Sequence, residues 1–338
     1  MARSNAKLPY KSIQIWLYIC SGFVFAMVLL GGITRLTESG LSMVDWRPVT
    51  GWLPPMSDYA WGNTFDAYRA SPEFQKLNFW MGLEDFKRIF WLEYLHRLLG
   101  RILGIVYLLP FVWFVFRYHL PAWLTRRLGL LFLLGTAQGA LGWYMVKSGL
   151  VDEPTVSHYR LAAHLGLAVV IYGIMLYIAA GLGSQKGNSA EFRRGSVWPA
   201  ALIFTTMIWG ALLAGLDGGA TFNTFPLMDG RFFPRDALLI SPLWLNFFEN
   251  IGLIQWLHRF LAITTVAVIM WTWWRHRRAK SMALNVLGVV AVLQFCLGIL
   301  TILSGASLYI AWAHQCGAMI LFSAAILRWR ETHPQTTA

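Results

Sequence analysis

Residues 91–101 combine ionisable side chains that seldom occur inside a membrane helix. Glu93, His96 and Arg97 lie at the start of a long apolar run. Glu93 and His96 are three residues apart, so on a helix they share one face. Ionisable groups at membrane depth are costly and usually serve a function, such as binding a ligand or transferring a proton. This segment is therefore the first candidate site.

A second segment, residues 255–261, repeats the pattern with a single change. It keeps a histidine–arginine pair, His258–Arg259, but Gln255 stands where the first segment has Glu93. A carboxylate can accept a proton or stabilise positive charge, and only the first segment has one. We therefore assign the chemistry to the first segment and expect an electron-transfer or structural role for the second.

Composition indicates a polytopic membrane protein. The chain has 338 residues, of which 57% are hydrophobic and only 13% are charged, whereas a soluble domain has roughly 25% charged residues. The net charge of +12 lies in short segments between apolar runs, which is typical of membrane topology and not of nucleic-acid binding. Cys20, Cys296 and Cys316 lie in apolar runs, and we expect neither a disulfide framework nor a cysteine metal site.

Eight apolar runs are long enough to cross a bilayer, so the predicted fold class is all-α. They cover residues 13–33, 93–116, 128–146, 161–182, 197–216, 254–274, 282–303 and 308–327. Basic residues gather in three connections: Arg117, Arg126 and Arg127; Lys186, Arg193 and Arg194; and Arg275, Arg277, Arg278 and Lys280. Positive connections face the cytoplasm. We therefore place the chain in a bacterial inner membrane, with both termini in the cytoplasm and the first helix retained.

An internal repeat relates the two halves of the chain. The matching pairs are Gln138 with Gln294, Gly142 with Gly298, Ser148–Gly149 with Ser304–Gly305, and Ala163–His164 with Ala313–His314. Four helices in each half give both halves the same orientation, which indicates a parallel repeat. We expect two pseudo-symmetric four-helix bundles, with an N-terminal half over 1–182, a cytoplasmic linker over 183–196 and a C-terminal half over 197–338.

Four histidines share a position near the outer end of an even-numbered helix. They are His96, His164, His258 and His314. Two imidazoles that face each other across a bundle are a common way to hold haem iron. Zinc is disfavoured, because two ligands in each half are too few for a closed site. Arg97 and Arg259 could pair with haem propionates or extend to the membrane interface.

Other features surround these histidines. Close approach of helices or of a flat macrocycle is possible at four glycines, namely Gly142, Gly166, Gly298 and Gly317. Two long outer connections, about 34–92 and 217–253, are rich in aromatic residues, proline and glycine. Within the first, Ser71 is an expected N-cap and 74–90 a possible interfacial helix. This stretch is either an aromatic belt or a lid over the outer site.

Taken together, these motifs make the sequence resemble the haem A synthase family over nearly its whole length. The resemblance rests on Gly31–Arg35, Glu93–Arg97, Gln138–Gly142, the His164 helix, Gln255–Arg259 and Ala313–Gln315. Some members of that family carry a cysteine pair in the first outer connection, and this chain has none there. A thiol-based role for such a pair is therefore not available here.

The resemblance implies a reaction and a set of roles. Haem O would be oxidised at a ring methyl to a formyl group, through a hydroxymethyl intermediate, to give haem A for cytochrome oxidase. His96 and His164 would bind the substrate haem iron, His258 and His314 would bind a haem b iron, and Glu93 would match the functionally important acid of the family. A bis-histidine iron leaves no open position for dioxygen. Either one ligand leaves, or electrons are withdrawn through the ring and Glu93 assists attack on the methyl group.

Two other functions remain open at the level of sequence. One is a two-haem membrane cytochrome that only transfers electrons, which would have no use for the unpaired Glu93. The other is a haem transporter, which would need a polar path that the helices lack. For the enzyme, the expected partners are the lipid bilayer, an electron donor, the haem O synthase that precedes it and a second copy of the chain.

Overall fold

The computed structural model describes residues 8–47, 50–150, 154–182, 197–279 and 281–332. Eight helices in this part of the chain are long and apolar enough to cross a membrane. They are α1 (Tyr10–Leu36), α3 (Leu83–Tyr118), α4 (Ala122–Ser148), α5 (His158–Leu182), α6 (Trp198–Gly215), α8 (Ile251–His276), α9 (Met282–Leu303) and α10 (Leu308–Thr332). The predicted all-helical, multi-pass membrane protein is confirmed.

Helix α3 begins ten residues before the predicted start. Its first turn contains Glu84 and Asp85, and the Asp85 carboxylate accepts the N–H of Gly82 at 3.2 Å. Acidic groups stabilise a helix N-terminus, so the helix starts here and not at Glu93. Its 36 residues span about 54 Å, well beyond a bilayer core of about 30 Å. The early turns of α3 therefore extend past the membrane.

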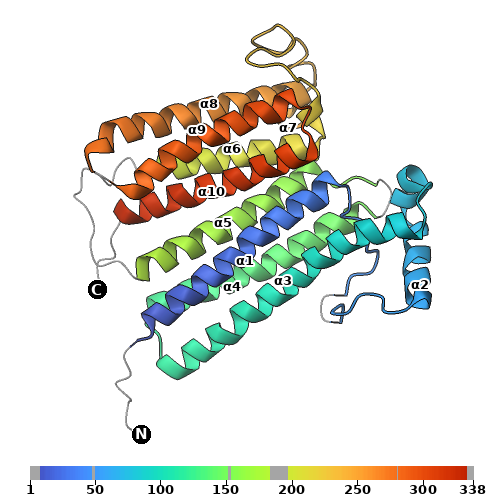
Figure 1. Ribbon diagram of the computed structural model, residues 1–338, viewed down its shortest axis with the longest axis horizontal. Coiled ribbons are helices and arrows are strands. Elements are labelled where there is room, and N and C mark those ends of the chain that lie inside the picture. The colour runs from blue at the N-terminus through green and yellow to red at the C-terminus, as the bar shows by residue number, and fades with distance from the viewer. Residues whose placement is uncertain (1–7, 48–49, 151–153, 183–196, 280, 333–338) are drawn as a thin grey trace.

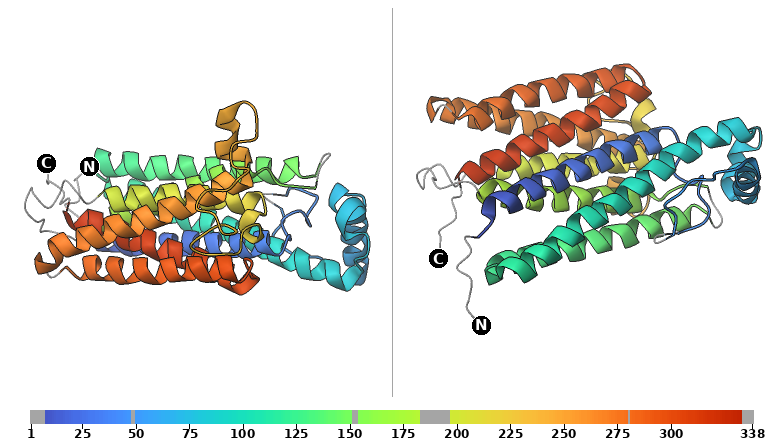
Figure 2. Two further views of the ribbon diagram at one scale, coloured as in Figure 1. Left: turned by 90° about the horizontal axis from the view of Figure 1, so that it is seen from above. Right: turned by 60° about the horizontal axis from the view of Figure 1, so that its bottom comes forward.

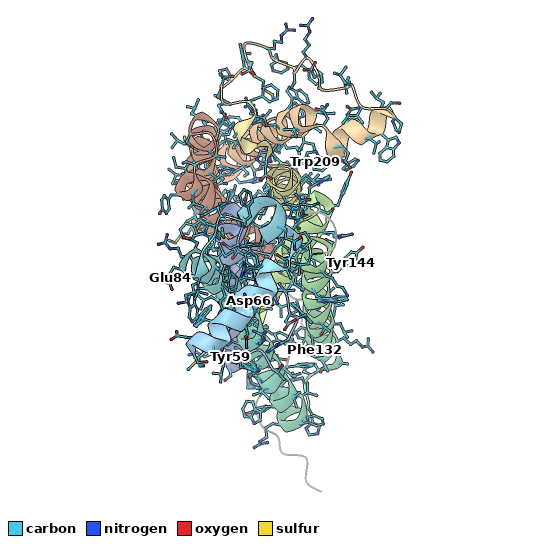
Figure 3. All side chains as sticks on the ribbon, turned by 90° about the vertical axis from the view of Figure 1, so that its right-hand side faces the viewer. Tyr59, Asp66, Glu84, Phe132, Tyr144 and Trp209 are labelled. Atoms are coloured by element: carbon cyan, nitrogen blue, oxygen red, sulfur yellow. The ribbon has the colours of Figure 1, made fainter. Side chains whose placement is uncertain are left out.

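Short helices lie in the long connections. They are α2 (Asp58–Arg69), the π-helix η1 (Phe74–Asn78), the 3-10 helices η3 (Gly218–Ala220), η4 (Leu243–Leu245) and η5 (Arg277–Ala279), and α7 (Asn246–Glu249). The Ser71 cap is confirmed, because its hydroxyl accepts the N–H of Phe74 at 3.3 Å. A single helix over 74–90 is wrong, since residues 79–82 interrupt it. Figure 3 shows α2 lying across one end of the molecule, with Tyr59 and Asp66 on it.

The eight long helices form two groups (Figures 1 and 2). In the N-terminal half, α1 and α4 each pack against α3 and α5, and in the C-terminal half α8 and α10 each pack against α6 and α9. Each group is thus a closed ring of four helices. Residues 37–82 and 217–250 join helices at the same end of both groups, which we name the long-loop end.

The two halves share one buried core. Helices α1 and α5 contact α10, and α5 also contacts α6. At one such contact a β-carbon on Gly173 would lie 3.0 Å from the ring of Phe322. The division into two domains stays a prediction. Its linker, 183–196, lies outside the described residues, as do both chain ends and Lys186, Arg193, Arg194 and Lys280.

Candidate functional site

Each of the four predicted histidines lies with its imidazole against a glycine of a neighbouring helix. His96 on α3 faces Gly31 on α1, and His164 on α5 faces Gly142 on α4. A β-carbon on these glycines would lie 3.0 and 2.9 Å from the rings. The C-terminal half repeats the arrangement, with His258 against Gly210 at 2.9 Å and His314 against Gly298 at 3.1 Å. A larger residue would displace the ring at each position.

The two imidazoles of the C-terminal half lie close together. The ring centroids of His258 and His314 are 6.4 Å apart, and the ring planes cross at 86°. A metal–imidazole bond is about 2 Å long and the ring centroid lies roughly 1 Å behind the nitrogen, so two imidazoles on one metal have centroids about 6 Å apart. The separation therefore fits two histidines that would bind one iron between them.

Hydrogen bonds orient the rings of this pair. Nδ1 of His258 lies 3.0 Å from the carbonyl oxygen of Thr206. A contact of this kind fixes the ring and leaves Nε2 for a metal. The side-chain amide of Gln294 donates to the carbonyl oxygen of His314 at 2.8 Å and lies 3.1 Å from its Nδ1.

The N-terminal half has the same amide in the same place. Gln138 donates to the carbonyl oxygen of His164 at 3.0 Å and lies 3.4 Å from its Nε2. Nδ1 of His96, Nδ1 of His164 and Oε1 of Gln138 are buried and make no hydrogen bond to the described part of the chain. Such orphaned polar atoms mark a place where a ligand or ion belongs. The donor set therefore fits a porphyrin, which supplies the other ligands of its iron.

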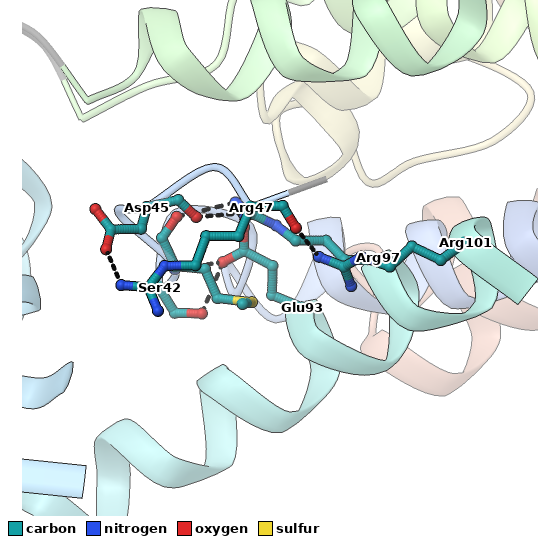
Figure 4. A network of polar contacts seen from close by, with 7 residues as sticks. Ser42, Asp45, Arg47, Glu93, Arg97 and Arg101 are labelled. Atoms are coloured by element: carbon teal, nitrogen blue, oxygen red, sulfur yellow. Dashed lines mark hydrogen bonds and ion pairs between the residues drawn. The ribbon is translucent and has the colours of Figure 1, made fainter. Parts of the chain in front are cut away.

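Glu93 is buried and fully engaged. Glu93 belongs to α3, and only 3% of its surface is exposed. One carboxylate oxygen accepts the hydroxyl of Ser42 at 2.7 Å and the N–H of Met43 at 2.8 Å, and the other pairs with Arg97 at 2.5 Å (Figure 4). The candidate catalytic acid therefore also anchors the first long connection to α3.

The guanidinium of Arg97 binds the backbone of the same connection. It donates to the carbonyl oxygens of Met43 at 2.9 Å and Asp45 at 3.0 Å, and it lies 5.4 Å from the centroid of the Trp46 ring. Figure 4 shows the hydrogen bonds from Arg97 to the first long connection. Both Nη atoms of Arg97 thus already have partners within the protein. The predicted contact of Arg97 with a propionate stays a prediction.

The C-terminal half repeats this contact between a helix and a long connection, with Gln255 in place of Glu93. Arg259 donates to the carbonyl oxygens of Phe222 and Thr224, both at 2.8 Å. Gln255 also donates to the carbonyl oxygen of Phe222 at 3.2 Å. At the matching place in the N-terminal half, Glu93 accepts the N–H of Met43. Each arginine therefore holds two carbonyls that are two residues apart in a long connection. The contact of Arg259 with a propionate likewise stays a prediction.

Some participating residues escaped the sequence reasoning. Ser42 carries no motif of its own, and Gly31 and Gly210 were not recognised as imidazole contacts. The sequence did contain a signal. Gly31 precedes Met43 by the same number of residues as Gly210 precedes Phe222. Each of these helix ends and the loop after it form one repeated unit.

Fold and site together define a multi-pass helical membrane protein in which four histidines each lie against a glycine, one of them near the buried Glu93. The family described as cytochrome oxidase assembly protein matches residues 14–326, and the chain belongs to this family. Among its relatives, the "Heme A synthase" of Nitrosospira multiformis is 44% identical, over 94% of this chain and 92% of the relative. The "Heme A synthase" of Rhodospirillum centenum is 45% identical, over 97% of this chain and 91% of the relative.

Proposed function

We propose that the protein is a haem A synthase, which oxidises a ring methyl of haem O to the formyl group of haem A. The observation that carries this proposal is the set of paired imidazoles in a chain that matches relatives named heme A synthase over nearly its full length. Haem is the class of ligand that two facing imidazoles in a helical bundle suit.

Each half has its own role in this proposal. His96 and His164 hold the iron of the substrate, haem O, and His258 and His314 hold a resident haem b. A bound haem b supplies a redox centre that can transfer electrons. The 6.4 Å separation of the second pair supports its part of the proposal.

Two contrasts between the halves support placing the substrate in the N-terminal half. Glu93 lies only there. A β-carbon on Gly135 or Gly139 of α4 would meet nothing within 4 Å, whereas the repeat places Ala291 and Phe295 at the corresponding positions of α9. A site that must exchange its porphyrin needs such space, and a site with a resident cofactor does not.

Glu93 acts on the substrate by its charge in this proposal. Both of its oxygens already accept hydrogen bonds or the ion pair with Arg97. That arrangement favours stabilisation of positive charge beside the ring over removal of a proton. The same contacts anchor the first long connection to α3 beside His96.

The orientation in the membrane follows from charge. Basic residues Arg117, Arg126 and Arg275 lie at the end opposite the long loops, and such ends face the cytoplasm. We infer an inner-membrane protein with both termini in the cytoplasm and the haem sites near the outer face. An electron donor and the haem O synthase are its expected functional partners, and a homo-oligomer is compatible with its exposed apolar helix faces.

Purified protein in detergent tests the function directly. Its bound haem is extracted and identified by chromatography and mass, and the protein is then incubated with haem O, a reductant and oxygen. Recovery of haem O, its hydroxylated form or haem A supports the proposal. Haem b alone, with no conversion of haem O, would instead identify an electron carrier.

A further inference from the structure

A cavity of about 270 Å³ lies at the long-loop end of the N-terminal half. One wall is the turn over residues 43–46 together with Arg97, and the other is the last turns of α4, with Trp143, Val146 and Lys147. We name it the Lys147 pocket. Two cations and two tryptophans in one cavity favour a ligand that is both anionic and flat.

The charges in this pocket are not equally available. Both Nη atoms of Arg97 already donate to the turn, and one of them also pairs with Glu93. The carboxylate of Asp45, which also lines the pocket, pairs with Arg47 at 2.8 Å. Lys147 contacts the ring of Trp143 at 5.3 Å and has no ion pair within the described part of the chain. Of the two cations that line the pocket, Lys147 is thus the one with no ion pair among the described residues.

The pocket is lined by residues of the two helices that carry His96 and contact His164, α3 and α4. Arg97 directly follows His96 in α3. On α4, Val146 lies one helical turn beyond Gly142, the glycine that contacts the ring of His164, and residues four apart share a helix face. A ligand centred between the two imidazoles would thus direct its outer edge toward this pocket.

The C-terminal half has no such cation. By the repeat that pairs Gln138 with Gln294, the counterpart of Lys147 is Leu303 and that of Trp143 is Ile299. The equivalent surface is therefore apolar and uncharged at both positions. Lys147 distinguishes the half that we assign to the substrate from the half that we assign to the resident haem.

We propose that Lys147 binds the carboxylate side arms of the substrate porphyrin and so sets how deeply and in which rotation the ring lies beside Glu93. This inference rests on the proposed function, because it assumes a porphyrin between His96 and His164. Binding involves no covalent or redox change. An ammonium–carboxylate contact at a partly exposed site contributes modestly to affinity and weakens with salt.

The test is a binding titration with a matched pair of porphyrins. Ferric protoporphyrin IX and its dimethyl ester differ only in whether the side arms are charged. Each is titrated into full-length protein carrying His258→Ala, so that the N-terminal half is reported, and His164→Ala in this background identifies the signal. Lys147→Leu supplies the counterpart residue of the other half, and Lys147→Arg restores the charge. Lys87→Leu, on the outer part of α3, is the control for loss of a surface cation.

In Lys147→Leu protein, the affinity for the free acid is expected to fall by roughly tenfold, which corresponds to one charge-assisted contact. Affinity for the dimethyl ester should stay the same, and Lys147→Arg and Lys87→Leu should resemble the parent. The salt dependence of free-acid binding should become weaker in Lys147→Leu.

Two results would overturn the inference. One is equal free-acid affinity in the parent and Lys147→Leu, and the other is an equal loss for acid and ester, which would indicate packing and not charge. Either result leaves the proposed function standing if the unsubstituted protein, with His258 intact, converts haem O. Failure of that unsubstituted protein to bind or convert haem O would refute the function itself.

Discussion

Glu93 and Gln255 occupy corresponding positions but make opposite hydrogen bonds. Glu93 accepts the N–H of Met43, whereas Gln255 donates to the carbonyl oxygen of Phe222. Both side chains are buried. The C-terminal half thus accommodates an amide at the position that corresponds to Glu93, and we expect an amide at position 93 to preserve the fold.

Glu93→Gln should preserve haem binding in both halves and stop conversion of haem O. The amide can keep a contact with the first long connection, but it removes the negative charge that stabilises the reacting ring. Haem content by absorbance and product by chromatography measure the two effects in one preparation. Normal product formation by the purified variant would refute the role of Glu93.

Glu73 is a second buried acid, outside the membrane-spanning segments. It is 4% exposed, and its Oε2 has no hydrogen bond within the described part of the chain. Burial raises the pKa of Glu73 from 4.5 to about 7, and the carboxylates of Glu93 and Glu38 add to the increase. The folded protein therefore holds this proton up to neutral pH, whereas the unfolded chain releases it in acid.

This raised pKa makes stability depend on pH in a defined direction. The stabilisation is complete below the unfolded pKa of about 4.5 and is lost as pH rises to about 7, with an upper limit of roughly 3 kcal/mol. The melting temperature in detergent should therefore fall between pH 5 and pH 8, and Glu73→Gln should remove that part of the fall. Glu84→Gln, an exposed acid paired with Lys87, is the matched control. An unchanged pH profile in Glu73→Gln would contradict the assignment.

Contacts between helices, and not single side chains, set the positions of the four imidazoles. Each ring lies on the α-carbon of a glycine in the neighbouring helix. Because the interior is close-packed, a shift of that helix would displace the ring and any ligand bound to it. Helix spacing and ligand geometry are thus coupled in each half.

Gly298→Val should lower the haem content of the C-terminal half by tenfold or more, because the added methyl groups push the ring of His314 out of line. The N-terminal half should still bind porphyrin. Gly129→Val is the control, since a β-carbon at Gly129 meets nothing within 4 Å. Absorbance of the purified proteins decides the matter, and full haem b content in Gly298→Val would show that the contact does not position the ring.

Gly139→Phe introduces the residue that the C-terminal half has at Phe295. The ring should fill the open space on α4 and reduce conversion of haem O at least tenfold, while haem b content stays normal. Gly129→Phe, ten residues away on the same helix, controls for added bulk. Turnover and haem content are measured side by side, and unaltered turnover would mean that this space is not used by the substrate.

The two halves are joined by polar contacts as well as by the shared core. Gln315, which follows His314, donates to the carbonyl oxygen of Val28 on α1 at 2.8 Å. The hydroxyls of Tyr172 on α5 and Ser323 on α10 lie 2.6 Å apart. Gly31 on α1 contacts His96, and α10 carries His314, so these contacts link helices that position an imidazole in each half.

Gly173→Leu should destabilise the whole molecule by about 1–3 kcal/mol, since the new side chain must overlap the ring of Phe322. The melting temperature in detergent should fall by several degrees. Gly22→Leu, where a β-carbon meets nothing within 4 Å, should change it little. If both variants melt like the parent, the contact between the halves does not limit stability.

Much of the architecture was predictable because membranes impose simple rules. The length of each apolar run identified eight helices. The spacing of His96, His164, His258 and His314 placed them at one end of those helices, and their pairing as ligands stays a prediction. Helix ends were less predictable, since the start of α3 depends on the local cap at Asp85. Helix α2 was missed because it is short and its apolar side chains pack only against a local cluster.

Residue types and their spacing were enough to assign a multi-pass helical membrane protein, since hydrophobic length and helical periodicity act locally along the chain. The contacts that residues make with other helices could not be predicted from the sequence. Only the packed structure shows that Glu93 and Arg97 hold the first long connection, that a glycine faces the imidazole of each predicted ligand, and that Lys147 lies beside Trp143 in a cavity. The physical reason is that these contacts join residues distant in the chain, and their geometry is decided by how the helices pack.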